Sequence, residues 1–352
     1  MPQVSDADYK RLTAYTLDDG DIVFSRVGSV DINALITPFQ SNWLFSGRVL
    51  RVRPQTNISS QFLHTRLETG SIKADIRARA VGQTMPSINT EILKITPLVL
   101  PTSAAEQEQI GSYFAAIDNL ITLHQRKFEK LTNVKKSMLE KMFPQNGSSY
   151  PEIRFKGFTD PWEQRKLGDI ADIVGGGTPS TGNPNYWDGD IDWYAPAEIA
   201  SQIYANSSQK KITDLGYENS SAKMLPPGTV LFTSRAGIGK TAILARKGCT
   251  NQGFQSIVPH RGELDSYFIF SRTEELKRYG ELVGAGSTFV EVSGKQMAVM
   301  ELMMPPTMRE QQTIGGFFQQ LDHLITLHQR KPFLMKWRTS DANRNQTNRL
   351  VL

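Results

Sequence analysis

Residues 106–127 and residues 310–331 are two copies of one segment. The first copy reads EQEQIGSYFAAIDNLITLHQRK and the second reads EQQTIGGFFQQLDHLITLHQRK. Each residue of the second copy lies 204 positions after its counterpart, as Glu310 does after Glu106. This period is far longer than the repeat unit of a solenoid, so it predicts a duplicated domain.

The repeat continues upstream of each copy at weaker similarity. Residues 17–28 resemble residues 225–237, with one residue inserted in the second stretch. Gly82 and Pro101 have counterparts at the same offset in Gly286 and Pro305. The repeating unit is therefore predicted to be a β-rich domain, a proline hinge and a long helix, in the order domain, helix, domain, helix.

Size and composition fit a folded chain of two or three domains. The chain has 352 residues, of which 39% are hydrophobic and 9% aromatic, and its formal net charge is +5. A mildly basic chain is compatible with a polyanionic partner but does not require one.

Cys249 is the single cysteine. Its being alone excludes an internal disulfide framework and a cysteine-rich zinc site, and favours an apolar packing role.

Nothing in the hydropathy pattern predicts a membrane protein. No apolar run approaches the roughly 20 residues that a membrane-spanning helix needs. The first residues also show no apolar core of a signal peptide. We therefore expect a cytoplasmic protein.

Residues 106–142 carry a heptad seam, with apolar residues spaced alternately by four and three. About 37 residues of helix at 1.5 Å rise would extend roughly 55 Å. The seam in the first helix is predicted to comprise Ile110, Phe114, Ile117, Ile121, His124, Phe128, Leu131, Lys135, Met138 and Met142. The seam in the second helix is predicted to comprise Ile314, Phe318, Leu321, Ile325 and His328.

The second helix is expected to end near Lys331, because the next seam position is Pro332. Proline in a helix interior costs about 3 kcal/mol. Residues 332–352 do not resemble residues 128–148 and are rich in Asn, Arg and Thr. We expect them to form a disordered tail, and a changed reading frame would explain their composition.

Two histidines, His124 and His328, occupy equivalent seam positions. One interpretation is a metal-binding or catalytic pair. The other is a polar residue that fixes helix register, as single polar seam residues do. Because no Cys, Asp or Glu stands at ligand spacing on that face, register is the favoured interpretation.

The second domain is predicted to be a mixed α+β domain of short strands and turns. Residues 229–234 and 241–245 have strand-like composition, and residues 274–279 suggest a short helix. Turn residues separate these runs, as at Asn183-Pro184 and Pro226-Pro227-Gly228.

Two motifs in this domain imitate enzyme signatures. Residues 234–241 end in Gly-Lys-Thr like a P-loop, but Ser234 stands where the first glycine is needed. Asn183-Pro184-Asn185-Tyr186 is similar to the Asn-Pro-Pro-Tyr element of amino-methyltransferases but lacks its second proline. No catalytic triad, paired carboxylates or metal-ligand cluster is evident, so we expect no catalysis by this chain.

The order of these motifs resembles the specificity (S, HsdS-type) subunits of type I restriction–modification enzymes. Leu167-Gly168-Asp169-Ile170, the Gly-Gly-Thr-Pro-Ser run and Asn-Pro-Asn-Tyr-Trp look like the opening of a target-recognition domain. Residues 226–235 are similar to its central strand, and the repeated 22-residue segment to its spacer helices. The resemblance covers nearly all of residues 12–331.

The resemblance implies a fold and a mechanism. The fold class is α+β, with two mixed α/β target-recognition domains joined by long antiparallel coiled-coil helices. Each domain reads half of a split site in double-stranded DNA, and the helices set the spacing between the half-sites. Methyltransferase (M) subunits dock on the chain and, through them, the motor–nuclease (R) subunit. S-adenosylmethionine, ATP and Mg²⁺ then belong to partner subunits, with no cofactor and no metal on this chain.

The chain departs from the family pattern at both ends. About 60 residues equivalent to 161–219 have no counterpart in the first half, so the first recognition domain is expected to be incomplete. The predicted domains are a partial first recognition domain at 1–104, a spacer helix at 105–146, a complete second recognition domain at 147–305, a truncated second helix at 306–331, and the tail at 332–352.

Polar or basic residues on predicted loops are the candidates for DNA contact, because such side chains neutralise phosphates or read base edges. The alternative for each is an ordinary solvated loop residue. The candidates are Thr178, Ser180, Tyr194, Lys210, Lys211, Arg235, Lys240 and Gln255 in the second domain and Arg26 in the first.

Three functions remain open from the sequence. The first is a DNA-specificity subunit, in which residues 147–305 bind DNA and residues 1–104 bind it more weakly. The second is a silent-cassette or non-functional fragment that folds in part, and the third a stand-alone nuclease or methyltransferase.

Because the shortened second helix covers only part of the first, we expect an apolar surface at residues 128–142 that associates with itself or with a methyltransferase subunit.

Overall fold

The computed structural model describes residues 4–199, 202–235, 237–284 and 291–345, with side chains up to residue 329 in the last range. The chain divides into two compact units. Unit 1 comprises Met1–Lys127 and His328–Leu352, and unit 2 comprises Phe128–Leu327. Gly286 of the repeat lies outside the described residues.

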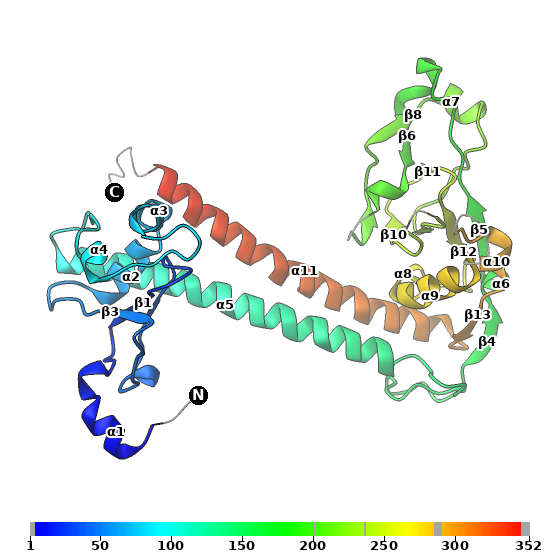
Figure 1. Ribbon diagram of the computed structural model, residues 1–352. Coiled ribbons are helices and arrows are strands. Elements are labelled where there is room, and N and C mark those ends of the chain that lie inside the picture. Colours follow the sequence, from blue (N-terminus) through cyan, green and yellow to red (C-terminus); the bar gives the residue numbers. More distant parts are fainter. Residues whose placement is uncertain (1–3, 200–201, 236, 285–290, 346–352) are drawn as a thin grey trace. The chain divides into compact units, whose positions relative to one another are not determined.

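Unit 1 is built on a three-stranded antiparallel sheet in the order β2-β1-β3 (Figure 1). Alternate residues of β1 point into the core, where Ile22 and Phe24 are almost fully buried. The strands are β1 (Ile22–Ser25), β2 (Asn33–Leu35) and β3 (Val49–Val52). The helices around them are α1 (Asp6–Arg11), α2 (Ser60–Leu67), α3 (Gly70–Arg79) and α4 (Thr90–Lys94), with 3₁₀ turns η1 (Thr13–Tyr15) and η2 (Pro38–Gln40).

Unit 2 contains a five-stranded sheet in the order β5-β12-β9-β10-β7, with all pairs antiparallel except β10 and β7. Its middle strand β9 is buried at every position. The strands are β5 (Ala171–Gly175), β7 (Tyr204–Ala205), β9 (Val230–Phe232), β10 (Thr241–Leu244) and β12 (Gln255–Pro259).

Two smaller sheets complete unit 2. One has the order β11-β6-β8 and the other pairs β13 with β4. Their strands are β6 (Trp187–Tyr194), β8 (Lys210–Ile212), β11 (Cys249–Thr250), β4 (Glu163–Lys166) and β13 (Glu301–Met304). The shorter helices are α6 (Leu167–Ile170), α7 (Asp214–Glu218), α8 (Ser266–Ser271), α9 (Thr273–Gly284) and α10 (Gly294–Ala298), with 3₁₀ turns η3 (Pro184–Tyr186) and η4 (Pro196–Glu198).

The three-stranded sheet of unit 1 and the five-stranded sheet of unit 2 share a core arrangement. In each, a central strand is flanked by the next strand along the chain on one side and by a later antiparallel strand on the other. Strands β2, β1 and β3 therefore correspond to β10, β9 and β12. The fold class is α+β, as predicted.

Two long helices follow the two sheets, α5 (Ala104–Lys141) and α11 (Met308–Asn345). The start of each agrees with the repeat. The predicted end of the second helix near Lys331 is wrong, because α11 continues through Pro332 to Asn345. A proline removes one backbone donor and crowds the carbonyl four residues back, and a helix can absorb that cost locally without ending.

The predicted exposure of residues 128–142 is also wrong. Met142 is 3% exposed, and Phe128, Leu131 and Met138 are partly buried. The reason is the register in which the two helices pair. In unit 2 the Lys135 ammonium contacts the Asp322 carboxylate at 2.6 Å, so residues late in α5 lie beside residues early in α11, as in an antiparallel pair.

In unit 1 His124 contacts its own repeat counterpart, His328, with 2.7 Å between the two Nδ1 atoms. A residue that meets its own counterpart marks the local two-fold axis of an antiparallel pair. Counting outward from this axis, residues 128–142 of α5 lie opposite residues 310–324 of α11. The second copy of the repeat thus covers the late part of α5, which explains the burial of Met142.

None of the helices in the described part of the chain has the length and apolar character to cross a membrane.

Two adjacent glycines on α11 test the close packing of α8 on this helix. A Cβ on Gly315 would lie 2.6 Å from Asp265 Oδ1 and 3.0 Å from the Phe268 nitrogen, whereas a Cβ on Gly316 would meet nothing within 4 Å. Gly315→Ala should lower the free energy of unfolding by about 2 kcal/mol through overpacking. Gly316→Ala should raise it by up to about 1 kcal/mol through helix propensity. Urea unfolding followed by tryptophan fluorescence measures both, and equal effects would refute the predicted contact.

Candidate nucleic-acid interface

Three loops of unit 2 meet at one end of the five-stranded sheet. Residues 175–180 follow β5, residues 234–240 follow β9, and residues 250–253 precede β12. Because β5 and β9 are both antiparallel to β12, the C-terminal ends of β5 and β9 lie beside the N-terminal end of β12, at the same end of the sheet. We call these segments, without residue 236, the recognition loops.

Hydrogen bonds hold the recognition loops against one another. The Gly177 nitrogen donates to the Thr250 carbonyl at 2.8 Å, and the Ser234 nitrogen donates to the Gly253 carbonyl at 2.9 Å. Gly253 is required here, since a Cβ would lie 2.8 Å from Pro196 and 3.5 Å from Arg235 Nε. The loops therefore form one polar surface with a defined backbone.

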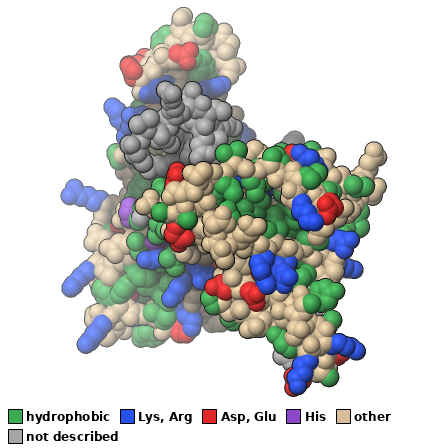
Figure 2. Space-filling view, turned by 90° about the vertical axis from the view of Figure 1, so that its left-hand side faces the viewer, with side chains coloured by type: hydrophobic (Ala, Val, Ile, Leu, Met, Phe, Trp, Pro, Cys, Tyr) green, Lys and Arg blue, Asp and Glu red, His purple; other side chains and the backbone are tan. Residues whose placement is uncertain are grey.

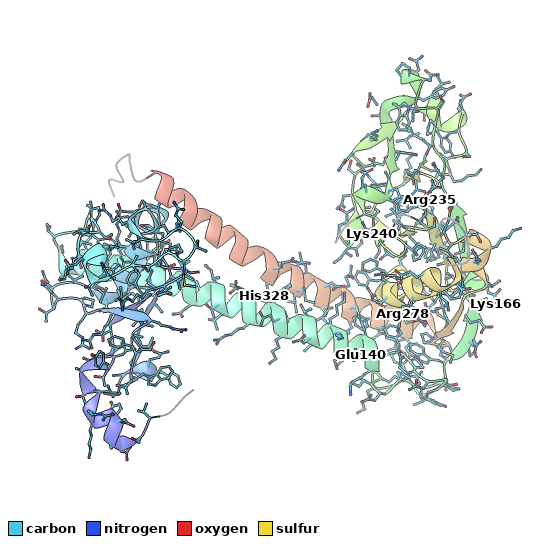
Figure 3. All side chains as sticks on the ribbon, in the orientation of Figure 1. Glu140, Lys166, Arg235, Lys240, Arg278 and His328 are labelled. Atoms are coloured by element: carbon cyan, nitrogen blue, oxygen red, sulfur yellow. The ribbon has the colours of Figure 1, made fainter. Side chains whose placement is uncertain are left out.

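Four of the predicted contact residues lie on this surface. Thr178 donates from Oγ1 to Gln252 Oε1, and Ser180 and Lys240 are exposed. Arg235 is half-buried on the loop that also carries Lys240 (Figure 3). The structure brings these side chains together from two segments far apart in the chain, since Arg235 lies 57 positions after Thr178.

The sequence reasoning missed Asn251 and Gln252. Asn251 accepts from the Gly253 nitrogen at 2.8 Å through its side chain, and Gln252 is exposed beside Thr178. Amide side chains of this kind hydrogen-bond base edges. The signal available was the Asn-Gln-Gly run before a strand-like segment. Gln255, the predicted contact residue of this stretch, lies half-buried at the start of β12.

Basic residues also gather around the small β11-β6-β8 sheet. Lys210 and Lys211 lie on β8, and Arg246 precedes β11. Lys210 Nζ lies 5.8 Å from the centre of the Trp187 ring. Trp193 on β6 donates its indole N–H to the Gly177 carbonyl at 2.8 Å, which joins this sheet to the recognition loops.

A buried carboxylate, Asp192, organises that basic group. Arg246 Nε lies 2.6 Å from its Oδ2 and Lys211 Nζ lies 3.7 Å from its Oδ1. Burial raises the pKa of Asp192, but hydrogen bonds from Ser208 and the Arg246 guanidinium outweigh burial and leave the pKa below its usual value. The ionised carboxylate of Asp192 holds Lys211 and Arg246 in place. Of the two predicted contact residues on β8, Lys210 and Lys211, only Lys210 is not held by this carboxylate.

The structure argues against Tyr194 as a DNA contact. Its side chain is 1% exposed and packs in an apolar cluster with Leu231 and Phe254. Its hydroxyl has no hydrogen-bond partner among the described residues, and burial raises its pKa to about 12. The prediction failed because successive side chains of β6 point to opposite faces. Trp193 packs in one apolar cluster and Tyr194 in another, and the sequence alone did not show that Tyr194 points into the core.

The segment that imitates a P-loop has different backbone chemistry. The Gly239 nitrogen donates to the Thr233 carbonyl and the Lys240 nitrogen donates to Thr233 Oγ1. These amides are therefore committed within the loop instead of facing a phosphate. Strand β10 follows, where a P-loop would open a helix. Likewise Asn183 accepts from the Asn185 nitrogen and forms an ordinary turn.

In unit 1, Arg26 lies at the position equivalent to Arg235. It is exposed and donates from Nη1 to the Gly47 carbonyl at 3.2 Å. It borders a hollow of about 510 Å³ lined by the residues that follow β1, by Gly47, by the loop between α3 and α4, and by Ile92 of α4. No counterpart of loop 175–180 is present in the described part of unit 1, so Arg26 lacks the neighbours that Arg235 has.

Cys249 packs in the core, and His124 and His328 lie against each other. Cys249 is fully buried, as predicted, and burial raises its thiol pKa to about 11. The ring centres of His124 and His328 are 4.9 Å apart. Within the described ranges no three His, Cys, Asp or Glu side chains are placed to hold a metal ion.

On the face shown in Figure 2, Lys and Arg side chains are scattered among hydrophobic and other side chains instead of forming one continuous patch. The recognition loops are identified by their convergence at one end of the five-stranded sheet.

A repeated α+β domain with polar loops at one sheet edge, each copy followed by a long helix, defines a class of two-domain recognition proteins. Comparison with known proteins gives the family. Residues 4–133 and 159–333 match the family described as the type I restriction modification DNA specificity domain, and the chain belongs to it.

Individual relatives are consistent with this family. The chain is 36% identical over 167 residues to the type I restriction enzyme MjaIX specificity subunit of Methanocaldococcus jannaschii, covering 47% of this chain and 38% of that subunit. It is 26% identical over 341 residues to the putative MjaX specificity subunit of the same organism, covering 93% of this chain and 77% of that subunit. The chain thus spans well under half of the first relative.

A solved structure supports the fold. The type I restriction–modification S subunit from M. genitalium superposes with a TM-score of 0.61 at 13% identity, covering 96% of this chain and 85% of that one. At this identity the likeness establishes the fold alone.

The buried hydroxyl of Tyr194 gives a stability prediction. Tyr194→Phe removes an unpaired polar atom from the core and should raise the free energy of unfolding by about 1 kcal/mol. DNA affinity should not change. The matched control is Tyr267→Phe, which removes a 3.0 Å hydrogen bond to buried Asp322 and should lower stability by about 1 kcal/mol. Thermal unfolding and DNA titration distinguish the two, and a loss of DNA binding in Tyr194→Phe would restore it as a contact residue.

Proposed function

We propose that this chain reads DNA as the specificity subunit of a type I restriction–modification complex. The observation that carries the proposal is the convergence of the recognition loops in unit 2. Arg235, Gln252 and Thr178 offer guanidinium, amide and hydroxyl groups, which are the groups that read base edges in the major groove. Lys210 lies on the adjoining small sheet, where a cation suits a phosphate contact.

The target is proposed to be bipartite, with unit 1 and unit 2 each reading one half-site. The internal repeat supports this, because two copies of one domain suit two half-sites. Unit 1 should bind DNA more weakly than unit 2, since it lacks a counterpart of loop 175–180 among its described residues. Residues of the helix seam such as Ile314 and Phe318 are proposed to hold α5 and α11 together.

Catalysis is proposed to belong to partner subunits. Methyltransferase subunits would dock on this chain and supply S-adenosylmethionine chemistry, and the motor–nuclease subunit would use ATP and Mg²⁺. The commitment of the Gly239 and Lys240 amides within their own loop supports the absence of nucleotide binding there. The isolated chain should neither cut nor methylate DNA.

A second candidate is a fragment of such a subunit that folds in part and has no restriction function. The observation that favours it is the smaller sheet of unit 1, which has three strands among the described residues where the main sheet of unit 2 has five. DNA binding by the full chain separates this candidate from the first.

Three charge-matched variants test the proposed readout. Selection of the full chain on random duplex DNA, followed by sequencing, should return a preferred half-site. Arg235→Gln should weaken that preference at one base pair by about tenfold to a hundredfold. Lys210→Gln should weaken binding to all sequences and reduce the slope of affinity against salt by about one.

The control is Lys166→Gln, an exposed cation on β4 outside the recognition loops (Figure 3). It should change neither preference nor salt slope. If Lys166→Gln lowers affinity as much as Arg235→Gln, binding is a matter of net charge and the proposed interface is wrong. Absence of any selected sequence would favour the non-functional fragment.

A further inference from the structure

Loop 175–180 of unit 2 is packed so closely at its start that two glycines are needed to form it. A Cβ on Gly176 would overlap the backbone of residues 250–251, and a Cβ on Gly177 would overlap the backbone of residues 221–222. The Gly177 nitrogen also donates to the Thr250 carbonyl at 2.8 Å. The first half of the loop is therefore held by the packing of its own backbone.

The loop continues through Thr178, and two tryptophans of β6 hold it on both sides of this residue. Trp193 donates its indole N–H to the Gly177 carbonyl at 2.8 Å. Trp187 donates its indole N–H to the Ser180 carbonyl at 3.1 Å. Two donors from one strand of the small β11-β6-β8 sheet thus fix the backbone just before and just after Thr178.

The two indoles are themselves held in place. Their rings meet edge to face, with centres 5.1 Å apart and planes at 89°. The Trp193 nitrogen donates to Ser208 Oγ at 2.9 Å, and the Ser208 nitrogen donates to Asp192 Oδ1 at 3.0 Å. Lys210 Nζ lies over the Trp187 ring. The donors that fix the loop therefore have defined positions of their own.

Neither indole N–H is available to a base edge. Trp193 is 6% exposed and packs in an apolar cluster with Ile212 and Cys249. Trp187 is half-buried, and its single N–H is used by the Ser180 carbonyl. Any effect of these two N–H groups on DNA readout must therefore pass through the loop.

The position of the loop determines where two recognition groups lie. Thr178 Oγ1 donates to Gln252 Oε1, so the orientation of the exposed Gln252 amide follows that of Thr178. A group that reads a base edge has to be held to within about 0.5 Å. The loop that carries Thr178 needs a fixed backbone to meet that limit.

The bond from Trp187 is not needed to satisfy the carbonyl that accepts it. Ser180 is exposed, and water can hydrogen-bond to an exposed backbone carbonyl as well as an indole can. An indole, unlike water, is attached to the fold. The consequence of this bond is therefore a fixed loop position.

We propose that Trp187 and Trp193 are positioning residues that determine base preference without reading DNA themselves. Their indole N–H groups fix loop 175–180 and through it the Thr178 hydroxyl and the Gln252 amide. The proposal rests on the DNA readout proposed above and adds to it two residues outside the recognition loops.

The proposal is tested by selection of variants of the full chain on random duplex DNA. Thr178→Val identifies the base pair that depends on this loop, and Arg235→Gln identifies one that depends on another loop. Trp187→Phe keeps an aromatic ring beneath Lys210 and removes the N–H. We expect Trp187→Phe to weaken preference at the Thr178 base pair about fivefold to tenfold. Preference at the Arg235 base pair and the salt slope should not change.

Two further measurements support the same reading. Combining Trp187→Phe with Thr178→Val should lose no more preference than Thr178→Val alone, because both act through one contact. Hydrogen exchange of free Trp187→Phe should be faster at the Thr178 and Ser180 amides and unchanged at residues 237–240. Trp193→Phe should give the same pattern, and Trp187→Phe still tests the proposal if the change at the buried Trp193 prevents folding.

The matched control is Tyr267→Phe, which removes a buried side-chain hydrogen bond of similar length from the same unit, away from the loops. It should lower stability and leave both base preferences intact. If it relaxes preference as Trp187→Phe does, the effect is one of stability and the proposal is wrong.

Two other outcomes would overturn the proposal while the DNA readout stands. One is a parent chain that selects a half-site in which no base pair loses preference in both Trp187→Phe and Thr178→Val. The other is an equal loss at the Thr178 and Arg235 base pairs, which indicates a general disturbance of the domain. A parent chain that selects no sequence contradicts the proposed function itself, and this inference falls with it.

Discussion

The ion pair between Glu310 and Arg154, with the Trp162 indole on the same carboxylate, is the interaction on which unit 2 depends. Burying a carboxylate is unfavourable unless its oxygens are fully bonded, and here a bidentate guanidinium and an indole bond them. This anchor fixes the chain between α5 and β4. Strands β4 and β5 follow directly, so the position of loop 175–180 at the candidate interface also depends on it.

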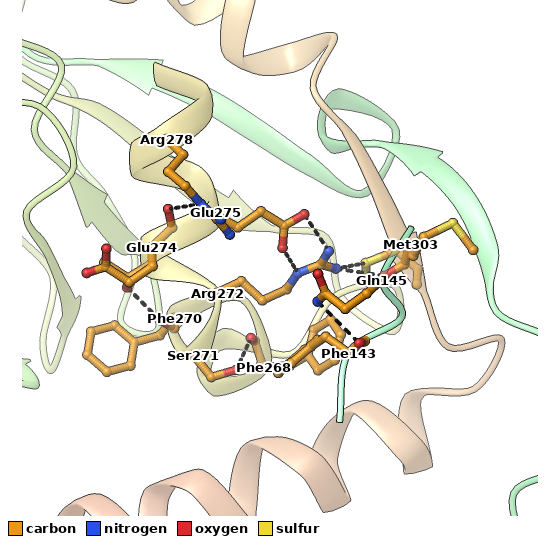
Figure 4. Close-up of polar contacts among 12 residues, drawn as sticks. Phe143, Gln145, Phe268, Phe270, Ser271, Arg272, Glu274, Glu275, Arg278 and Met303 are labelled. Atoms are coloured by element: carbon orange, nitrogen blue, oxygen red, sulfur yellow. Dashed lines mark hydrogen bonds and ion pairs between the residues drawn. The ribbon is translucent and has the colours of Figure 1, made fainter. Parts of the chain in front are cut away.

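The same interaction explains the difference between the two units. Both units carry the same three groups. They are a glutamate (Glu106 or Glu310), an arginine (Arg66 or Arg272) and a phenylalanine on the long helix (Phe114 or Phe318). Among the described residues, the chain after α5 fills the space between them in unit 2 (Figure 4), whereas the equivalent groups of unit 1 line a hollow.

Local patterns in the sequence predicted local structure well. The heptad seam located the start of α5, and strand-like composition located β9 and β10, because helix and strand periodicities are written in neighbouring residues. The register between α5 and α11 was missed. The resemblance implied an antiparallel pair, but the position of its centre at His124 and His328 became evident only from the contact of those two residues.

The candidate interface was only partly predictable for a related reason. Thr178 and Arg235 were identified from their residue types, but Gln252 was missed and Tyr194 was misplaced. Which loops meet depends on the strand order β5-β12-β9, and which side chains face outward depends on the register of β6, and neither is encoded in a short window of sequence. Arg66 and Glu106 gained meaning only from comparison with their filled counterparts in unit 2.

The most direct test of this account compares two equivalent glutamates. Glu310→Gln leaves Arg154 buried without its charged partner and should lower the free energy of unfolding of unit 2 by about 3 kcal/mol. Glu106→Gln changes the same residue of the repeat at an exposed site and should change stability by less than about 0.5 kcal/mol. Urea unfolding of both variants of the full chain, followed by tryptophan fluorescence, measures the difference. Equal effects of the two substitutions would contradict the claim that the buried glutamate anchors one unit while its counterpart remains open.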